Sequence, residues 1–244
     1  MKLLLPWCLA SVALAFAGCQ SPDKKSPAVV PAAIPQSDLD RIANALAAAP
    51  NSLAIFSNAT ATQPLDPAIS GVIVDLDRQR AYVYSQGQLA AATRIASGKR
   101  NYRTPTGDYK IGQKNPNHAS NLYGKLVHSE TGEEQPGEVD TRTAEIPEGM
   151  VFRGAPMRHF MRFHTPDGSA TPIGFHRGHV PNRPASHGCI RLPGRSASEL
   201  FKMIPKETPV FVYGETHGQP PRPLPVMDDS EIQRDTKRQK KKKP

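Results

Sequence analysis

Alternating apolar and polar positions fill the middle of the chain, and this two-residue period predicts β-strands. Residues 70–98 contain two short runs rich in Val, Ile and Tyr on either side of the polar turn DRQR, which indicates a hairpin. A turn followed by a strand is indicated over 104–115, and a closing strand over 208–214. Between them, residues 151–178 predict short strands with a turn at 166–168.

Two segments carry helical periodicity instead. In residues 37–49 the apolar side chains share one helical face, and Ser37 stands where a capping residue is expected. Residues 196–205 predict a second helix, in which Ser196 and Glu199 have the spacing of a capping box.

Strands outnumber helices, so residues 68–214 are expected to form one mostly-β domain. A sandwich or a barrel would bury the apolar face of these strands. Within this domain, residues 116–149 are polar and lack a clear period. They predict a long loop or insertion.

The start of the chain has the composition of an export signal. An apolar run over 3–17 follows Lys2, and it is too short for a comfortable transmembrane span. The stretch Phe-Ala-Gly-Cys that ends at Cys19 resembles a bacterial lipobox, which implies a lipoprotein-type signal peptide over 1–18 and a lipid on Cys19. Gln20 after it favours the outer membrane, again by resemblance to lipoproteins. The alternative is an ordinary signal peptide. Both place the protein in the cell envelope, on the periplasmic side.

The segments that flank the domain are predicted to be extensions. Residues 19–67 are rich in Pro, Ala and Ser and indicate a tether that contains the first helix. The formal net charge is +9, but the terminal run RDTKRQKKKKP holds seven Lys and Arg against one Asp. Residues 215–244 are therefore expected to be a disordered basic tail, and the nearly neutral remainder disfavours a nucleic-acid partner. Contact of the tail with anionic wall polymers or lipid headgroups is a weaker alternative.

Cys189 is the only cysteine beyond residue 19, and it stands in the sequence Ser-His-Gly-Cys. An exported chain with one unpaired thiol invites a chemical explanation, because such a thiol is prone to oxidation. Acyl transfer through a thiol needs a base to take its proton and N–H donors for the oxyanion. The motif offers His187 as a nearby histidine, and Gly188 permits a tight turn with exposed N–H groups.

More than one histidine could act as the base. His187 is closest in sequence, whereas His176 ends an apolar run and would lie at the end of a strand beside the cysteine loop. His164 also ends an apolar run and is a rival base. Two further interpretations are a buried structural thiol and a zinc set of His176, His179, His187 and Cys189, although that spacing matches no common structural-zinc pattern.

Several stretches of the domain together resemble one known family. PIGFHRG followed by RPASHGCIRLP resembles the signature of the L,D-transpeptidase catalytic domain, often called the YkuD domain. GVIVDLDRQRAYVY resembles its first hairpin, SGKRNYRTPTGDYKI its SGK and TPTG segments, and TPVFVYG its closing strand. The resemblance covers about 70–214. It implies an L,D-transpeptidase-like β-sandwich or barrel with one or two short helices near the active-site cysteine.

The resemblance also implies a role for each residue of the site. Cys189 would be the nucleophile and His176 its general base, oriented by a backbone carbonyl such as that of Arg177. Arg191 would bind a substrate carboxylate. Arg162 is placed either to contact substrate or to lie solvated at a strand end. The oxyanion loop would consist of Ser186, His187 and Gly188 with the N–H of Cys189. No cofactor and no metal are implied.

Members of this family cleave the tetrapeptide stem of peptidoglycan after its third residue and pass the acyl group from cysteine to an amine. The resemblance therefore implies a cell-wall acyltransferase whose acceptor is a second stem peptide or a lysine of a wall-anchored lipoprotein. Two alternatives stay open. One is a hydrolase with the same site, either an L,D-carboxypeptidase or a lipoprotein-releasing enzyme. The other is a non-catalytic wall-binding lipoprotein.

Overall fold

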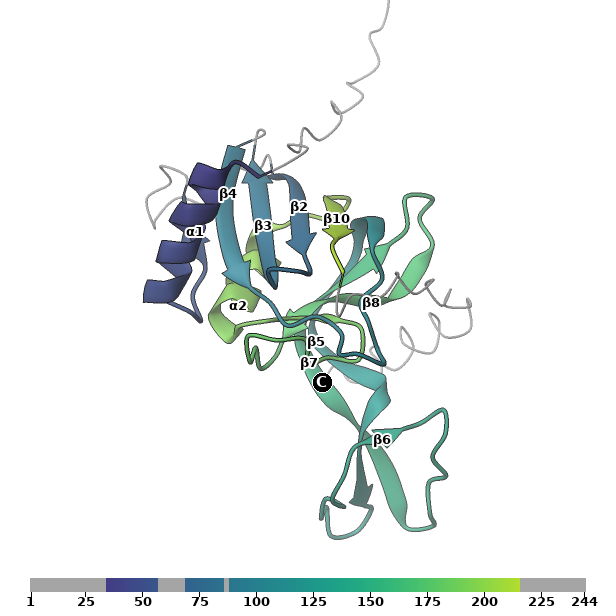
Figure 1. The fold of residues 1–244 in the computed structure, drawn as a ribbon. Coiled ribbons are helices and arrows are strands. Elements are labelled where there is room, and N and C mark those ends of the chain that lie inside the picture. The colour runs from purple at the N-terminus through teal and green to yellow at the C-terminus, as the bar shows by residue number, and fades with distance from the viewer. Residues whose placement is uncertain (1–33, 57–68, 86–87, 216–244) are drawn as a thin grey trace, which may run out of the picture.

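The strands of this protein form a single large sheet with one helix on each side (Figure 1). The computed structural model describes residues 34–56, 69–85 and 88–215. The elements are α1 (Gln36–Ala48), β1 (Ala54–Ile55), β2 (Ile69–Asp75), β3 (Arg80–Ser85), β4 (Gln88–Arg94), β5 (Gly107–His128), β6 (Val139–Asp140), β7 (Met150–His164), β8 (Ala170–Arg177), β9 (Ile190–Leu192), α2 (Gly194–Met203) and β10 (Pro209–Tyr213).

The order of the strands is β1-β4-β3-β2-β10-β5-β7-β8-β9, with β6 paired to β5. Two neighbouring pairs are parallel, β2 with β10 and β8 with β9. The mostly-β prediction is confirmed, and the sheet does not close into a barrel. Its two ends still approach each other, because isolated bridges join Ala96 to Arg191 and Gly98 to Ser186.

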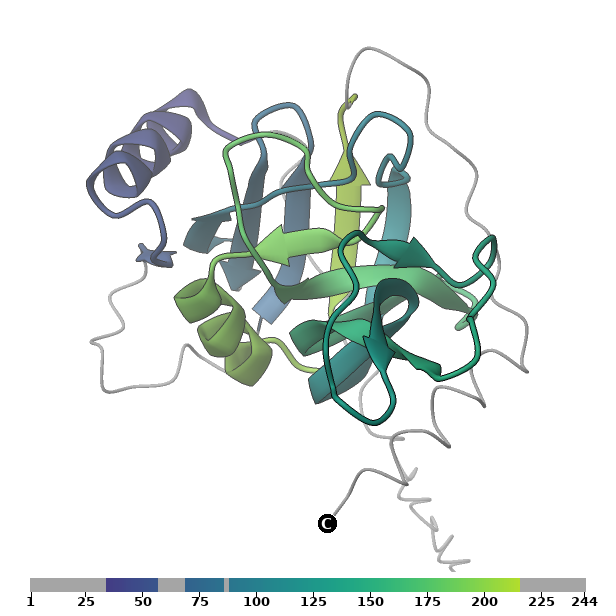
Figure 2. The same cartoon turned by 90° about the horizontal axis from the view of Figure 1, so that it is seen from below.

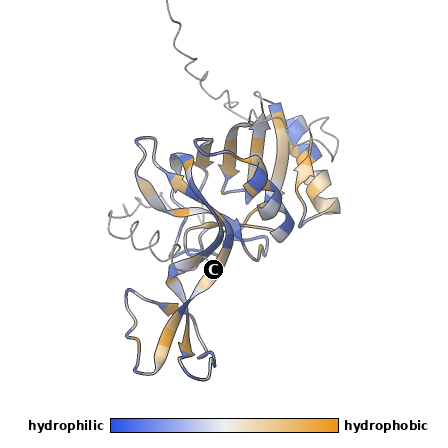
Figure 3. Cartoon of the chain, turned by 180° about the vertical axis from the view of Figure 1, so that it is seen from behind, coloured by the Kyte–Doolittle hydropathy of each residue, from blue (hydrophilic) through white to orange (hydrophobic). Residues whose placement is uncertain are grey.

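Two hydrophobic clusters lie on opposite faces of the sheet, because side chains alternate along each strand. Val72 and Val83 belong to the large cluster that α2 covers with Leu200. Their neighbours Ile73 and Tyr82 belong to a smaller cluster beneath α1. Figure 2 shows the two helices separated by the strands, and Figure 3 shows the apolar positions of the sheet and the two-sided character of α1.

The helix positions were predicted correctly, but their caps were not. Helix α1 begins at Gln36 after Pro35 and α2 at Gly194 after Pro193, and neither has a side-chain capping bond. Ser196 instead lies buried inside α2, where its hydroxyl accepts a hydrogen bond of 2.9 Å from Thr93. The Ser196 side chain therefore forms a tertiary contact in place of the predicted helix cap.

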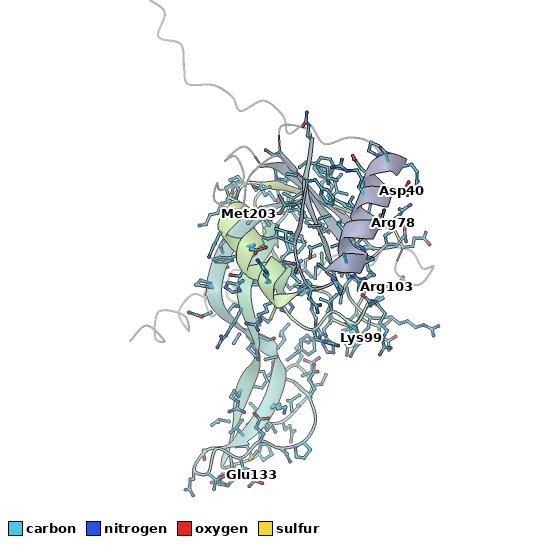
Figure 4. The ribbon with its side chains drawn as sticks, turned by 90° about the vertical axis from the view of Figure 1, so that its left-hand side faces the viewer. Asp40, Arg78, Lys99, Arg103, Glu133 and Met203 are labelled. Atoms are coloured by element: carbon cyan, nitrogen blue, oxygen red, sulfur yellow. The ribbon has the colours of Figure 1, made fainter. Side chains whose placement is uncertain are left out.

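The loop predicted over residues 116–149 is confirmed only in part. Strand β5 continues to His128 and pairs with β7, which starts at Met150, whereas residues 129–149 between them form turns, irregular chain and the short strand β6. Residues 120–154, here called the arm, project from the sheet, with Glu133 at the far end (Figure 4). The connection over residues 129–149 is largely exposed, and in the strand before it Leu126 and Val127 are buried side by side, so the arm lacks the two-residue apolar period of a half-buried strand.

A pair of glycines shapes the base of the arm. Gly124 lies opposite Gly154, and a Cβ on Gly154 would meet the carbonyl oxygen of Ser120 at 1.8 Å. Any larger residue would therefore force the crossing strands apart. The arm consequently leaves the sheet at a fixed place, next to the residues described below.

Some predictions concern residues outside the described ranges. These are the signal peptide with Cys19, most of the tether and the basic tail. Among the described residues, neither helix is long and apolar enough to cross a membrane.

We expect Leu200→Ala to lower the free energy of unfolding by about 2–5 kcal/mol, because it removes a fully buried side chain between α2 and the sheet. Lys202→Ala on the exposed side of the same helix is the control and should stay within about 0.5 kcal/mol of the parent. Urea unfolding followed by circular dichroism measures both. Equal losses in the two variants would contradict the placement of Leu200 in the core.

Candidate active site

The candidate site lies where three neighbouring strands place chemical groups on one face of the sheet. Phe175 of β8 pairs with Ile190 of β9, and both face the large hydrophobic cluster. The next pair, His176 and Arg191, must face the other way. Cys189 directly precedes β9, beside this pair of strands, and also packs against the edge of the large cluster.

A cleft of 1210 Å³ opens over this face. The sheet, the loop between β8 and β9, and the base of the arm all contribute to its walls. Those of its lining residues that matter for the chemistry are Cys189, His176, Arg191, Arg162, His187 and His118.

The thiol of Cys189 is held in its protonated form. Its Sγ lies 3.6 Å from the carbonyl oxygen of Pro172, to which it donates a weak hydrogen bond. Burial raises the pKa of the thiol to about 11, although a backbone hydrogen bond from Gly174 and the charges of Arg162 and Arg191 act in the opposite direction. At neutral pH the site therefore contains a neutral thiol.

His176 has the geometry of an oriented general base. Its Nδ1 lies 2.8 Å from the carbonyl oxygen of Arg177 and must carry the proton, because a carbonyl can only accept. This leaves Nε2 with its lone pair. Burial lowers the pKa of His176 to about 4, and the charge of Arg191 lowers it further, while the Arg177 carbonyl opposes this. The ring is therefore neutral at physiological pH and able to accept a proton.

The rival base is not placed near the thiol. His164 pairs with Lys110 and Ala170 toward the other end of these strands, and its ring lies against Gly112. It is absent from the described lining of the cleft, whereas His176 is part of it. The structure thus brings His176, and not His164, to the same site as Cys189.

His187 is held as a structural link between the loop and the arm. Its ring stacks on Tyr123 of the arm at 4.2 Å and meets Tyr102 edge-on at 4.5 Å. Its Nδ1 lies 3.3 Å from a carboxylate oxygen of Glu138. Burial lowers the pKa of His187, and Glu138 opposes this shift. A ring held by contacts on three sides is poorly placed to take the proton of the Cys189 thiol.

Hydrogen bonds of the Ser186 and Thr104 hydroxyls fix the loop before Cys189. Ser186 accepts from the N–H of Gly188 at 3.1 Å and donates to the carbonyl of Cys189. The Thr104 hydroxyl donates to the carbonyl of Gly188 at 2.8 Å and accepts from the N–H of Gly98 at 2.9 Å. Gly188 has φ +121°, a conformation that other residues rarely adopt.

These bonds change which N–H groups could bind an oxyanion. Gly188 was expected among the donors, but its N–H already donates to Ser186. Within the described part of the chain, the N–H groups of His187 and Cys189 have no acceptor. Of the three expected N–H donors to an oxyanion, those of His187 and Cys189 therefore remain available.

The two predicted arginines differ in their surroundings. Arg191 lines the cleft opposite His176, with its stem against Gly178. Arg162 is only 4% exposed, so the solvated strand-end interpretation is wrong. Its guanidinium donates to the side chain of Gln113 and to the carbonyl of Thr171, at 3.0 Å in each case.

The zinc interpretation requires at least three ligands directed at one point. No three His, Cys, Asp or Glu side chains of the described residues gather in this way. His176 directs Nδ1 to a carbonyl and His187 directs its own Nδ1 to Glu138, so the four residues named for zinc do not form a set.

Comparison with known families assigns the chain to one of them. The profile of the L,D-transpeptidase catalytic domain, YkuD, matches residues 70–212. This match spans more than half of the chain, and the protein therefore belongs to the YkuD family of L,D-transpeptidase catalytic domains. A comparison with curated protein sequences finds no significant match.

The chain is also similar to solved structures of L,D-transpeptidases. An L,D-transpeptidase from Stackebrandtia nassauensis is 20% identical, with 67% of this chain and 64% of that chain covered and a TM-score of 0.44. One from Mycobacterium smegmatis is 21% identical, with 59% and 58% covered and a TM-score of 0.40. L,D-transpeptidase 1 of Mycobacterium tuberculosis is 18% identical, with 59% and 60% covered and a TM-score of 0.41. The chain thus spans less than two thirds of each of these proteins.

Several residues of the site were not predicted from the sequence. Gly174 could have been found, since it lies two residues before His176 and shares its face of a strand. His118, buried and stacked on Phe160 at 4.3 Å, comes from the segment expected to be a loop. Tyr102 and Tyr123 reach His187 only through tertiary structure, and no local pattern marks them.

The neutral state of the thiol predicts an unusual pH dependence of alkylation. With the Cys189 pKa raised to about 11, its alkylation by iodoacetamide should rise about tenfold per pH unit from pH 6 to pH 10. Mass spectrometry of the peptide that contains Cys189 measures the rate. The same peptide in urea is the control and should level off near the ordinary thiol pKa of about 8.5. A plateau in the folded protein near pH 7 would instead indicate a preformed thiolate–imidazolium pair.

Proposed function

We propose that this protein is a cysteine acyltransferase that acts on peptidoglycan stem peptides. The observation that carries the proposal is the single cleft that Cys189 lines together with His176, whose Nδ1 is fixed by the Arg177 carbonyl. Family membership gives the substrate class its support. A binding protein would need neither an oriented imidazole nor a half-buried thiol in the same cleft.

In the first half-reaction, Sγ of Cys189 attacks the carbonyl carbon of the third residue of the stem. Nε2 of His176 takes the thiol proton as the S–C bond forms. The N–H groups of His187 and Cys189 then face the oxyanion. When the C–N bond breaks, His176 returns the proton to the departing amine of the terminal D-residue, which leaves a thioester on Cys189.

In the second half-reaction, an amine attacks the thioester. His176 takes a proton from this amine, the C–S bond breaks, and the thiol of Cys189 is restored as the amide forms. The acceptor is proposed to be the side-chain amine of a second stem peptide, or a lysine of a wall-anchored lipoprotein. Water in place of the amine would give the hydrolase, for which no observation in the cleft provides separate support.

The charge of the cleft suits a substrate with several carboxylates. Its basic lining residues are Arg103, Lys125, Arg142, Arg153, Arg162, Arg177 and Arg191, and its acidic ones are Glu134 and Glu138. A stem peptide has a carboxylate at its C-terminus. Arg191, beside His176, is proposed to bind a carboxylate of the stem.

We expect His176→Ala to slow acyl transfer about 100-fold or more, and Cys189→Ser to abolish it, because these residues supply the base and the nucleophile. Mass analysis of purified tetrapeptide muropeptides after incubation provides the measurement. His164→Ala is the matched control and should retain nearly full activity. Cross-linked dimers support the transferase, trimmed monomers support the hydrolase, and an unchanged mixture contradicts both.

The proposal extends to the location of the protein. The lipobox-like stretch that ends at Cys19 supports a lipid anchor, and Gln20 supports the outer membrane. The site would then act on peptidoglycan from the periplasmic side of the envelope.

This anchor gives a separate expectation. Cys19→Ala should move the protein from the membrane pellet to the soluble periplasmic fraction, because the lipid-bearing thiol is lost. Cys8→Ala, within the apolar run of the signal, serves as the control and should remain in the pellet. If Cys19→Ala also stays in the pellet, the lipoprotein proposal is wrong while the proposed activity is unaffected.

A further inference from the structure

A transverse row of residues crosses the sheet beneath the candidate nucleophile. Gln113 of β5 pairs with Arg162 of β7, and Arg162 pairs with Gly174 of β8. Directly opposed residues in antiparallel strands share a face, so Gln113, Arg162 and Gly174 lie on one face of the sheet. Arg162 and Cys189 both line the cleft described above.

Gly174 allows β8 to approach β7 closely next to Arg162. A Cβ at this position would come within 2.3 Å of the Met161 carbonyl oxygen and 2.9 Å of the Arg162 Cα. The strands are thus too close for any side chain there. The missing side chain also lets the Gly174 backbone act on the Cys189 thiol, through a hydrogen bond that lowers its pKa.

The guanidinium of Arg162 is fixed at this place. It lies over the ring of Phe160, 5.0 Å from the ring centre, and donates to Gln113 and to the Thr171 carbonyl. The carbonyl of the next residue, Pro172, accepts the hydrogen bond of the Cys189 thiol. Two consecutive carbonyl groups of β8, those of Thr171 and Pro172, therefore accept hydrogen bonds from Arg162 and Cys189.

We propose that Arg162 is a positioning residue whose fixed positive charge stabilises the negative charge that develops on the sulfur of Cys189. The inference rests on the proposed role of Cys189 as nucleophile. It assigns to Arg162 a function that differs from the substrate contact expected from its sequence position.

The electrostatics of the site explain why such a charge is needed. Burial opposes ionisation of the thiol, and the charge of Arg162 counteracts this more strongly than that of Arg191 does. Arg191 lines the open cleft, where a bound substrate carboxylate would neutralise its effect on the sulfur. Arg162 is 4% exposed and keeps its charge at any working pH, so its effect persists when substrate is bound.

The test is the pH profile of Cys189 alkylation by iodoacetamide in the full chain. In this reaction the sulfur forms a bond to carbon, iodide leaves, and the thiol proton passes to solvent. Arg162→Gln should shift the profile upward by one to two pH units and slow alkylation at pH 9 about three- to tenfold. This fall is smaller than the loss of thiolate, because a more basic thiolate is more nucleophilic.

Two variants separate charge from packing. Arg162→Lys keeps the charge and should stay within about twofold of the parent rate. Arg158→Gln removes an exposed arginine from the same strand and should change nothing. If Arg162→Gln does not fold, Gln113→Leu takes its place, since it frees the guanidinium from one anchor and should slow alkylation about two- to threefold.

An unchanged profile in Arg162→Gln, or an equal loss in Arg162→Lys and Arg162→Gln, would overturn the inference. For Gln113→Leu, a rate equal to that of the parent would do the same. These outcomes are independent of the muropeptide assay. If Arg162→Gln shifts the alkylation profile but the parent protein leaves muropeptides unchanged, the role of Arg162 stands and the proposed function is wrong. If the profile is unshifted but the parent protein modifies muropeptides, the proposed function stands and the role of Arg162 is wrong.

Discussion

The parallel pairing of β8 with β9 is the constraint on which the site depends. Parallel neighbours need a long connection, and residues 178–189 supply it here. The register of this pair sets Arg191 opposite His176, and Cys189 directly precedes the second strand. Because the side chains alternate, the same register directs Phe175 and Ile190 into the core. A slip by one residue would exchange the two faces, which would turn the imidazole into the hydrophobic core and the core side chains into the cleft.

The chain secures this short strand from its other side. The stretch after β4 forms two backbone hydrogen bonds between Ala96 and Arg191, and Thr104 joins Gly98 to Gly188. Gln79 in turn holds Ser97 through a buried amide. β9 is only three residues long, so these contacts add hydrogen bonds to its short ladder and hold the loop before Cys189 in place.

Much of the fold followed from sequence because most of its strands are half-buried and therefore show a two-residue period. The strands of the arm could not be predicted in this way, because their apolar residues do not alternate with polar ones and their pairing through backbone groups leaves no mark on composition. The predicted caps failed for a related reason, since Ser196 is recruited by Thr93, a residue distant in sequence. A local sequence pattern reflects only the interactions between residues close in sequence. A contact with a distant residue can be more favourable and change the role of a side chain.

The site was predictable to the extent that its residues are close in sequence. His176 and the motif around Cys189 lie on two short segments with a recognisable spacing. The choice between His176 and His164 depended on register, because both residues end apolar runs and only pairing shows which end of β8 faces the thiol. The aromatic ring contacts of His187 with Tyr102 and Tyr123 join three distant segments. No pattern in one sequence could have connected them.

Burial gives the proposed nucleophile its particular chemistry. It raises the pKa of Cys189 to about 11 and lowers that of His176 to about 4, so both groups are neutral at rest. A neutral thiol is a weak nucleophile and resists oxidation, which would suit the proposed location in the cell envelope. Attack must then be coupled to proton transfer, and the charge separation this creates needs stabilisation inside the cleft. Fixed cations beside the sulfur can supply it without forming a thiolate in the absence of substrate. Burial and buried charge therefore have complementary effects. Burial keeps the thiol protonated, and the buried charge lowers the free energy needed to develop negative charge on its sulfur.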